Sequence, residues 1–583
     1  MCVQIDQIEN RSKDTKLKCM RCWLPIPAFG LLALLMAACR PTSAWEPAAA
    51  FTHFETDYFS ALFRWSPSYG TLAGFHEYDT ALEDWPAGAH QKRISELRQL
   101  SARLARIDVS ALPQGRQLDA QLLASQLAAE QYDLEQLQTW RKNPMQYVGK
   151  PGEAIDALMK RDFAPATERM ASVTARLRQV PALLAAMRAN VQNPPREFTD
   201  LALTMARGSV GYFRDTVPEW AAANGSKDNA LREAARKAAE AMQAAVAWLE
   251  KDLLPKSHGA YAIGAEAFSR KLAYEEMVTT PLARLLQLGE ENLRKDQAAF
   301  RAAAARVALG KSPAQAMAML AGDHPDEKQL LPAARQTIEK IRQFLIDKQI
   351  VTLPAGTRPT IAETPPFARN GAFASMDSPG SYETKAKQAY YYITPPEPHW
   401  DAVHKEQHLR LFNRPVLDVI TIHEAFPGHY VQFLYAPQWP SKTRKLLGPA
   451  SNVEGWAHYA EQMLVEEGYG AGNPRLKLAQ LSEALLRDCR YIVGIKLHTQ
   501  GMTVEDGARF FVQQGYQEPA NAYEEARRGA YNPTYLYYTL GKLLLYELRG
   551  DYQKKHGAPL RQFHDAFLKE GPLPFVLLRR ALL

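Results

Sequence analysis

The segment HEAFPGHYVQ, residues 423–432, places two histidines and a glutamate beside a Pro-Gly pair. Imidazole nitrogens and carboxylate oxygens are common zinc ligands, and a hydrolytic zinc site also needs an open position for water with a carboxylate next to it. His423 and His429 therefore suit two ligand positions, and Glu424 suits the base that accepts a proton from the water. The pattern predicts hydrolysis by a metal-activated water.

The six-residue spacing of the two histidines requires an interruption of the helix. In the common H-E-x-x-H arrangement, four residues turn through about 400°, so both rings share one face. Six residues turn through about 600°, and the rings of a regular helix would diverge by roughly 120°. Pro427 breaks the hydrogen-bond ladder and Gly428 tolerates unusual backbone angles, which would let His429 face His423. The alternative is that Pro427 simply ends a helix and neither histidine binds metal.

The segment Asn452–Glu461 supplies a third ligand. Glu454, His458 and Glu461 are spaced i, i+4, i+7 and share one helix face, with apolar residues between them. A buried carboxylate needs a partner, and a metal ion is a natural one. We predict Glu454 as the third ligand, with His458 or Glu461 orienting a ligand from behind. A solvated charged helix face is the alternative.

A further predicted helix carries Arg487, Arg490 and His498, of which Arg490 and His498 align at i, i+8. Such side chains bind a substrate carboxylate or stabilise a developing oxyanion. Structural salt bridges are the other common use of such arginines.

A tyrosine-rich segment begins at Tyr531. Asn532 is a plausible N-cap with Pro533 at the first helical position, and on that helix Tyr531, Tyr535 and Tyr538 would point the same way. A tyrosine hydroxyl donates well to a tetrahedral oxyanion. Tyr538 or Tyr535 is therefore a candidate donor, and a place in the apolar core is the alternative for both.

Mainly helical elements are expected to position these residues. Residues 45–350 are rich in strong helix formers and predict a helical N-terminal subdomain. Prolines and glycines interrupt residues 351–400, where the aromatic run Gln388–Thr394 is stopped by prolines and predicts a small β element with a strand at a sheet edge. The helical pattern then resumes, so we predict that residues 351–583 form the subdomain that bears the metal site.

The charge of the chain argues against a nucleic-acid partner. The 583 residues contain 70 basic and 63 acidic side chains, a formal net charge of +7, and no run of like charges typical of a nucleic-acid-binding tail. A hydrophobic content of 46% is enough for a large apolar core. We therefore expect a globular protein that acts on a small substrate.

The first 44 residues are typical of a targeting segment. Arg21 precedes the apolar stretch Trp23–Ala38, which is too short to span a bilayer comfortably. The sequence Met36-Ala37-Ala38-Cys39 resembles a bacterial lipobox, in which the cysteine becomes the lipidated first residue; ordinary cleavage after Ala44 is the alternative. We expect an exported protein of the periplasm or outer membrane, anchored to the membrane by lipid on Cys39.

HEAFPGHYVQ fits the H-E-x-x-P-G-H-x-x-Q hallmark of the bacterial family called domain of unknown function 885, which is similar to the helical gluzincin metallopeptidases. Weaker matches support the resemblance, namely Leu72–Asp79, Ile263–Phe268, the Glu454-Gly-Trp-Ala segment and Tyr538-Thr-Leu-Gly541. One departure is Gly494, which stands where the family often has an aspartate.

The resemblance implies a large, mainly α-helical, gluzincin-like zinc hydrolase with one Zn2+ per chain. His423, His429 and Glu454 would be the ligands and Glu424 the general base, with Gln432 of the hallmark close by. Many members of the family look like exported lipoproteins, in agreement with Cys39.

The leading hypothesis is an exported zinc peptidase that cleaves short peptides. Glu424 would take a proton from the metal-activated water, and His458, His498, Tyr535 or Tyr538 would stabilise the oxyanion. A hydrolase of non-peptide amides or esters would use the same groups. The third possibility is a catalytically inactive, lipid-anchored binding or scaffold protein.

Overall fold

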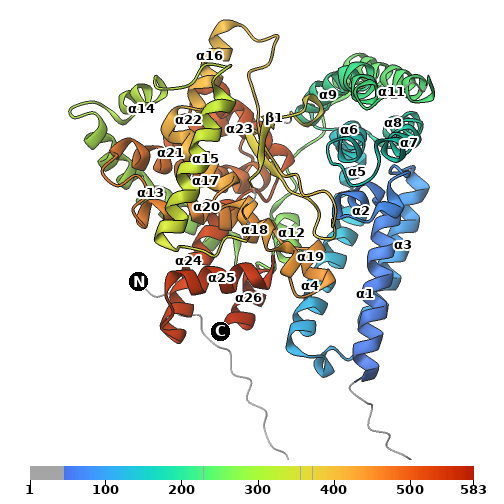
Figure 1. Ribbon diagram of the computed structural model, residues 1–583, viewed down its shortest axis with the longest axis horizontal. Coiled ribbons are helices and arrows are strands. Elements are labelled where there is room, and N and C mark those ends of the chain that lie inside the picture. Colours follow the sequence, from blue (N-terminus) through green and yellow to red (C-terminus); the bar gives the residue numbers. More distant parts are fainter. Residues whose placement is uncertain (1–44, 227–228, 355, 357, 370–371) are drawn as a thin grey trace, which may run out of the picture. The chain divides into compact units, whose positions relative to one another are not determined.

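The computed structural model of the protein describes residues 45–226, 229–354, 356, 358–369 and 372–583 (Figure 1). The predicted signal segment, with Cys39, lies outside the described residues. The described residues belong to one compact unit that consists of many helices and a small sheet, so the predicted mainly α-helical class is confirmed. None of the described helices is both long and apolar enough to cross a membrane.

In the N-terminal part of the unit, all the described elements of secondary structure are helices. Helix α11 shows why: its buried residues Leu231, Ala235, Ala238 and Met242 recur at three- and four-residue steps, the spacing of one helix face. The helices are α1 (Trp45–Trp65), α2 (Pro67–Ala73), α3 (Ala87–Leu104), α4 (Gln114–Tyr132), α5 (Thr139–Lys142), α6 (Met145–Met159), α7 (Ala166–Leu177), α8 (Val180–Asn190), α9 (Arg196–Gly211), α10 (Val217–Ala223), α11 (Asn229–Trp248), α12 (Ala265–Glu275), α13 (Leu282–Val307), α14 (Pro313–Ala321) and α15 (Leu330–Lys348).

The helices that carry the predicted site follow the sheet. Helix α13 packs along α21, and α20 packs along α24. The helices are α16 (Ala402–Leu411), α17 (Arg414–Glu424), α18 (His429–Leu434), α19 (Lys442–Leu446), α20 (Ala450–Glu466), α21 (Pro474–Thr499), α22 (Val504–Gly515), α23 (Pro519–Tyr531), α24 (Tyr537–His556), α25 (Leu560–Glu570) and α26 (Phe575–Leu582).

The sheet has three short strands, β1 (Thr360–Glu363), β2 (Ala374–Asp377) and β3 (Tyr390–Ile393), in the order β1-β3-β2. Strand β3 pairs in parallel with β1 and antiparallel with β2. The strand expected within Gln388–Thr394 is therefore present, but the prediction that it lies at a sheet edge was wrong. The prolines that suggested an edge follow the strand, so they remove none of its hydrogen bonds.

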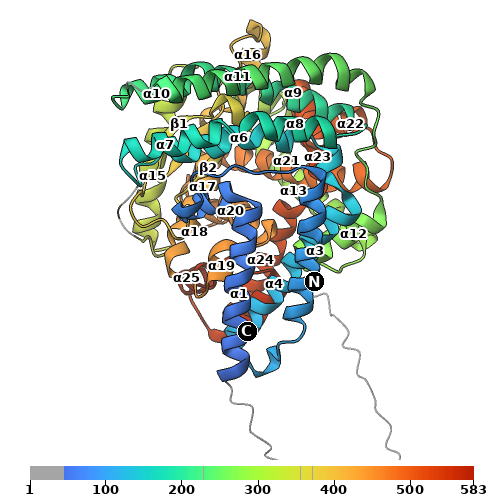
Figure 2. The ribbon, with the colours of Figure 1, turned by 90° about the vertical axis from the view of Figure 1, so that its right-hand side faces the viewer.

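Two apolar cores hold the unit together. The smaller is formed mainly by α6, α7, α8, α9 and α11, which Figure 2 shows lying against one another. The larger runs from Phe51 to Leu578 and includes residues on both sides of position 350. Packing of the described residues is therefore continuous across the boundary at residue 350 that the change in composition suggested.

Candidate metal centre

The hallmark segment folds as two helices joined by a short loop. Helix α17 ends at Glu424 and α18 begins at His429, so the Pro-Gly pair interrupts the helix as predicted. Gly428 is required by space: a Cβ on this residue would lie 1.7 Å from the carbonyl oxygen of His423. The close approach folds α18 back against the end of α17, and the rings of His423 and His429 lie 4.8 Å apart, centre to centre.

Helix α20 fixes this loop from the other side. The indole Nε1 of Trp456 donates to the carbonyl oxygen of Pro427 at 2.9 Å, and the Gln432 side chain donates to Asn452 Oδ1 at 2.9 Å. Both bonds join the hallmark segment to α20, and the three side chains that make them are buried. Gln432 thus holds α18 in place and does not line the cavity at the centre.

The three predicted ligands come together. Glu454 Oε2 lies 3.3 Å from His423 Nε2 and 3.4 Å from His429 Nε2, and one ligand atom of each residue lies within 4.8 Å of the others. A tetrahedral zinc ion with ligands at about 2.0–2.1 Å separates them from one another by roughly 3.3 Å. The oxygen has no hydrogen-bond partner among the described residues although it is buried. Two nitrogens that face one buried carboxylate oxygen without a hydrogen bond fit a divalent cation.

Charge favours the anionic form of the oxygen ligand. Burial raises the pKa of Glu454, but His429 and His423 outweigh burial and hold this pKa well below its usual range. Burial lowers the pKa of His423, yet the carboxylates of Glu454 and Glu461 raise it to about 9. Because a metal ligand must be deprotonated, binding of a cation would displace the proton from His423.

Glu461 orients His423 from behind. Its Oε1 lies 2.7 Å from His423 Nδ1, and its Oε2 lies 3.2 Å from His458 Nδ1. Burial raises the pKa of Glu461, but the charge of Arg487 and the bonds from the histidines hold it well below the usual range. The ionised carboxylate can only accept, so His423 donates through Nδ1 and turns Nε2 toward Glu454.

Glu424 lies beside the three ligands and lines the same cavity. Its Oε2 is buried and has no hydrogen-bond partner among the residues the structure describes. Burial raises the pKa of Glu424, although His429 and His423 oppose this. A carboxylate with a raised pKa and a free oxygen is suited to accept a proton.

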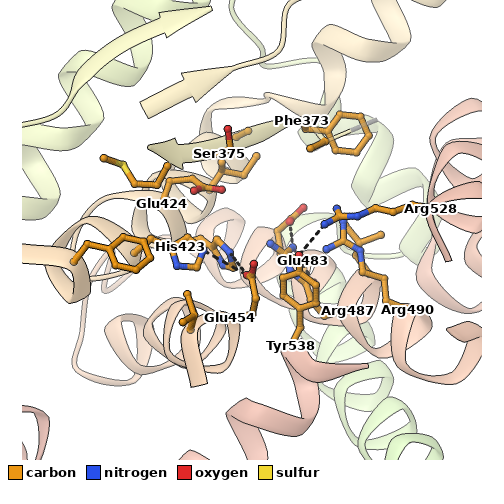
Figure 3. Close-up of a pocket in the computed structure, with 18 residues that line it drawn as sticks. Phe373, Ser375, His423, Glu424, Glu454, Glu483, Arg487, Arg490, Arg528 and Tyr538 are labelled. Carbon is orange, nitrogen blue, oxygen red and sulfur yellow. Dashed lines mark hydrogen bonds and ion pairs between the residues drawn. The ribbon is translucent and has the colours of Figure 1, made fainter. Parts of the chain in front are cut away.

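The cavity has a volume of about 290 Å³. Figure 3 shows its labelled residues: His423 and Glu424 lie on one side, Arg487, Arg490 and Arg528 on the other, and Glu454 and Tyr538 between them. Strand β2 and the residues before it cover the cavity. The lining residues that the sequence did not single out include Phe373, Ser375, Met376, Glu483 and Arg528.

Of the two tyrosines predicted as oxyanion donors, the structure brings only Tyr538 to the cavity. Its hydroxyl oxygen accepts a hydrogen bond from Arg528 Nη2 at 2.9 Å, and the hydroxyl donates to none of the described groups. Helix α24 begins at Tyr537, so Asn532 is not its N-cap and Tyr531 to Tyr538 do not share one helical face.

Tyr535 instead lies in the core. It donates to the carbonyl oxygen of Glu525 at 2.8 Å, and a Cβ on Gly494 would lie 3.2 Å from its ring. Gly494, where the related family often has an aspartate, therefore leaves room for this ring.

The two histidines predicted as oxyanion donors also lie outside the cavity lining. His498 Nε2 bonds to the Gly529 carbonyl oxygen at 2.8 Å, and His458 is fully buried behind Glu461. Burial lowers the pKa of His498 to about 4 and of His458 to about 3, so both are neutral near pH 7. Arg490 lines the cavity, but Glu525 accepts two hydrogen bonds of 2.6 Å from it.

Two glycines explain how Tyr538 comes to lie near Glu454. A Cβ on Gly541 would lie 2.0 Å from the Ser451 carbonyl oxygen and 2.7 Å from the Cα of Gly455. Helices α20 and α24 can therefore approach closely only because both residues lack a side chain. This crossing brings the Glu454 end of one helix to the Tyr538 end of the other.

The solved structures that resemble this one include two proteins described as candidate lipoproteins. A candidate lipoprotein of unknown function from Shewanella oneidensis is 26% identical, with a TM-score of 0.74 and coverage of 91% of this chain and 99% of that chain. A candidate lipoprotein from Colwellia psychrerythraea shares the fold at 17% identity, with a TM-score of 0.74 and coverage of 93% and 98%.

No curated protein matches this chain. The family model described as bacterial protein of unknown function, DUF885, matches residues 67–582 and therefore includes all residues of the candidate metal centre. The chain belongs to this family.

Proposed function

We propose that the protein is an exported zinc-dependent hydrolase that cleaves peptide bonds. The observation that carries the proposal is the group of His423, His429 and Glu454, in which Glu454 Oε2 lies 3.3 and 3.4 Å from the two imidazole nitrogens, close to the separation of tetrahedral zinc ligands. Two imidazole nitrogens and one carboxylate oxygen suit zinc, and three protein ligands leave a position open for water.

A bound zinc ion would supply a Lewis acid and lower the pKa of water to about 7. Glu424 has the geometry to accept the proton of the attacking water and to return it to the leaving amine, because its free oxygen lies in the same cavity. Tyr538 donates its hydroxyl proton to the developing oxyanion. Arg528 supports this role, since its bond to the tyrosine oxygen leaves the hydroxyl proton free for the substrate.

We include the location of the protein in the proposal. Two structurally similar proteins are described as candidate lipoproteins, which supports export and a lipid anchor on Cys39 at the periplasmic face or the outer membrane.

Metal content tests the site directly. Purified residues 45–583 are expected to hold close to one zinc per chain after supplementation, measured by elemental analysis under non-chelating conditions. His423→Ala and Glu454→Ala each remove a ligand and should lose the metal, whereas Glu424→Gln should retain it. A wild-type protein without zinc would overturn the proposal and favour a scaffold protein.

A peptide library then tests the reaction. Glu424→Gln should reduce hydrolysis by about 10²–10⁴-fold, because it removes the proton acceptor. Equal rates for the wild type and this zinc-loaded variant would assign the hydrolysis to a contaminant and contradict the role of Glu424.

A further inference from the structure

The wall of the cavity opposite the metal ligands carries three arginines and one carboxylate, Glu483, and a second carboxylate, Glu525, bonds to one of these arginines without lining the cavity. Glu483 pairs with Arg487, and Glu525 pairs with Arg490 through two hydrogen bonds. Arg487 also lies 3.3 Å from Glu461, which is already bonded to His423. Arg528 is therefore the arginine of this wall without an ion pair to a described carboxylate, although the charge of Glu525 still acts on it.

Arg528 makes no ion pair within 4.0 Å with any carboxylate that the structure describes. Its one hydrogen bond to a described side chain goes to the neutral hydroxyl of Tyr538. The guanidinium lines the cavity and is partly exposed there. A guanidinium carries five N–H donors in a planar fork, so most of its donors remain for a ligand.

The ligand that fits this position is a carboxylate. Arginine binds a carboxylate through two parallel hydrogen bonds, and one guanidinium without an ion pair matches a monoanion better than a doubly charged phosphate. Tyr538 bonds to Arg528 and lies with its ring centre 6.3 Å from that of His423. A group held by Arg528 is therefore separated from the metal ligands by the width of one tyrosine side chain.

A second cavity leads away from the centre. It has a volume of about 580 Å³ and shares Met376, Phe433 and Val453 with the first, but Arg528 lines only the first. Because the two cavities share these lining residues, a peptide bound at the metal ligands would extend toward the larger cavity and away from Arg528. The carboxylate bound by Arg528 would then belong to the part of the substrate on the opposite side of the cleaved bond.

We propose that Arg528 binds the C-terminal carboxylate of a peptide, so that the enzyme removes residues from the carboxyl end. This inference rests on the proposed peptidase function.

Matched peptides test the carboxylate directly. Wild type should cleave a free-acid peptide about 10–100-fold faster in kcat/KM than its C-terminal amide, the range expected for a hydrogen-bonded charge pair. Arg528→Gln should remove this preference, and Arg528→Lys should restore part of it. The ratio of kcat/KM for the free-acid peptide to kcat/KM for the amide reports on the carboxylate alone. Any effect of Arg528 on Tyr538 cancels in this ratio, since it acts on both peptides.

Arg509→Gln is the control for the loss of one arginine charge. Arg509 lies exposed on α22 and pairs with Asp506, and it lines neither cavity. This variant should keep the wild-type ratio. If the amide is cleaved as well as the acid, the peptidase function stands and the carboxylate site is overturned.

Binding provides a readout that does not depend on turnover. Zinc-loaded Glu424→Gln should bind the free-acid peptide about 10–100-fold more tightly than the amide in calorimetry, and adding Arg528→Gln should abolish the difference. Equal affinities, or no binding of either peptide, would overturn the carboxylate site. If inorganic phosphate binds to this variant but the free-acid peptide does not, Arg528 would belong to a phosphate site instead. Loss of zinc or of all hydrolysis would identify a failure of the proposed function itself.

Discussion

Helices α20 and α21 both carry charged residues and histidines into the interior, but they satisfy them differently. On α20, Glu454 meets two histidines and leaves a buried oxygen without a hydrogen bond. On α21, Arg490 and His498 both bond to groups of α23. Helix α21 also has buried polar atoms without a hydrogen bond, among them His498 Nδ1 and Asp488 Oδ2, but among the described residues only Glu454 meets other ligand atoms at metal-binding distances. A polar stripe on a helix therefore indicates a ligand site only where its unpartnered atom faces further ligands.

Tyr538 and Tyr535 test this difference between the two regions, and we expect the largest change in activity here. Tyr538→Phe should lower kcat by about 10²–10³-fold, because it removes a donor to the oxyanion. Tyr535→Phe should leave kcat unchanged and cost about 1 kcal/mol of folding free energy, since it loses one buried hydrogen bond. Steady-state kinetics and urea unfolding of both variants would check this. A similar loss of kcat in both would contradict the separation.

Glu461 of α20 and Glu525 of α23, both buried, test the same comparison through their effects on metal binding. Glu461→Gln should weaken zinc binding by about 10–100-fold, because Glu461 orients His423 and favours its Nε2 as the ligand atom. Glu525→Gln should leave zinc affinity unchanged while lowering stability, since it breaks the buried pair with Arg490. Competition with a zinc chelator measures both affinities. Weaker zinc binding in Glu525→Gln would show that α21 and α23 also support the centre.

Two glycines of α24 test how closely the helices must approach. Gly541→Ala should destabilise the protein by about 1–3 kcal/mol, because the new methyl group would overlap Ser451 of α20. Gly550→Ala on the same helix meets nothing within 4 Å and should be neutral or stabilise by up to about 1 kcal/mol. Thermal unfolding compares the two variants. Equal stabilities would mean that the crossing of α20 and α24 is not tight.

The last comparison concerns the dependence of stability on pH. Burial holds the pKa of His498 at about 4, below the value of about 6.5 expected in the unfolded chain. The unfolded state therefore binds the proton first as pH falls, and the stability due to neutral His498 is present above pH 6.5 and lost toward pH 4. The free energy of unfolding of His498→Gln should fall less steeply over this range, by about 1.4 kcal/mol per pH unit. Urea titrations at several pH values would check the slopes; parallel slopes would contradict this assignment.

The helical class and the candidate ligands could be predicted from local sequence patterns. Apolar residues at helical spacing are a local signal, and the Pro-Gly interruption between His423 and His429 is local as well. Glu454 could be chosen because an acidic residue among apolar neighbours needs a partner wherever the helix packs.

The other side chains that meet those ligands became evident only from the packing of the folded chain. Tyr538 and Tyr535 look equivalent in sequence. Tyr538 lies on α24, which begins at Tyr537, and lines the cavity, whereas the ring of Tyr535 lies in the core in the space beside Gly494. No local sequence pattern identifies Arg528. It stands out only because Glu483 and Glu525 pair with Arg487 and Arg490 and not with it. Partners of this kind come from segments far apart in the chain, and their pairing is set by packing, which local sequence patterns do not specify.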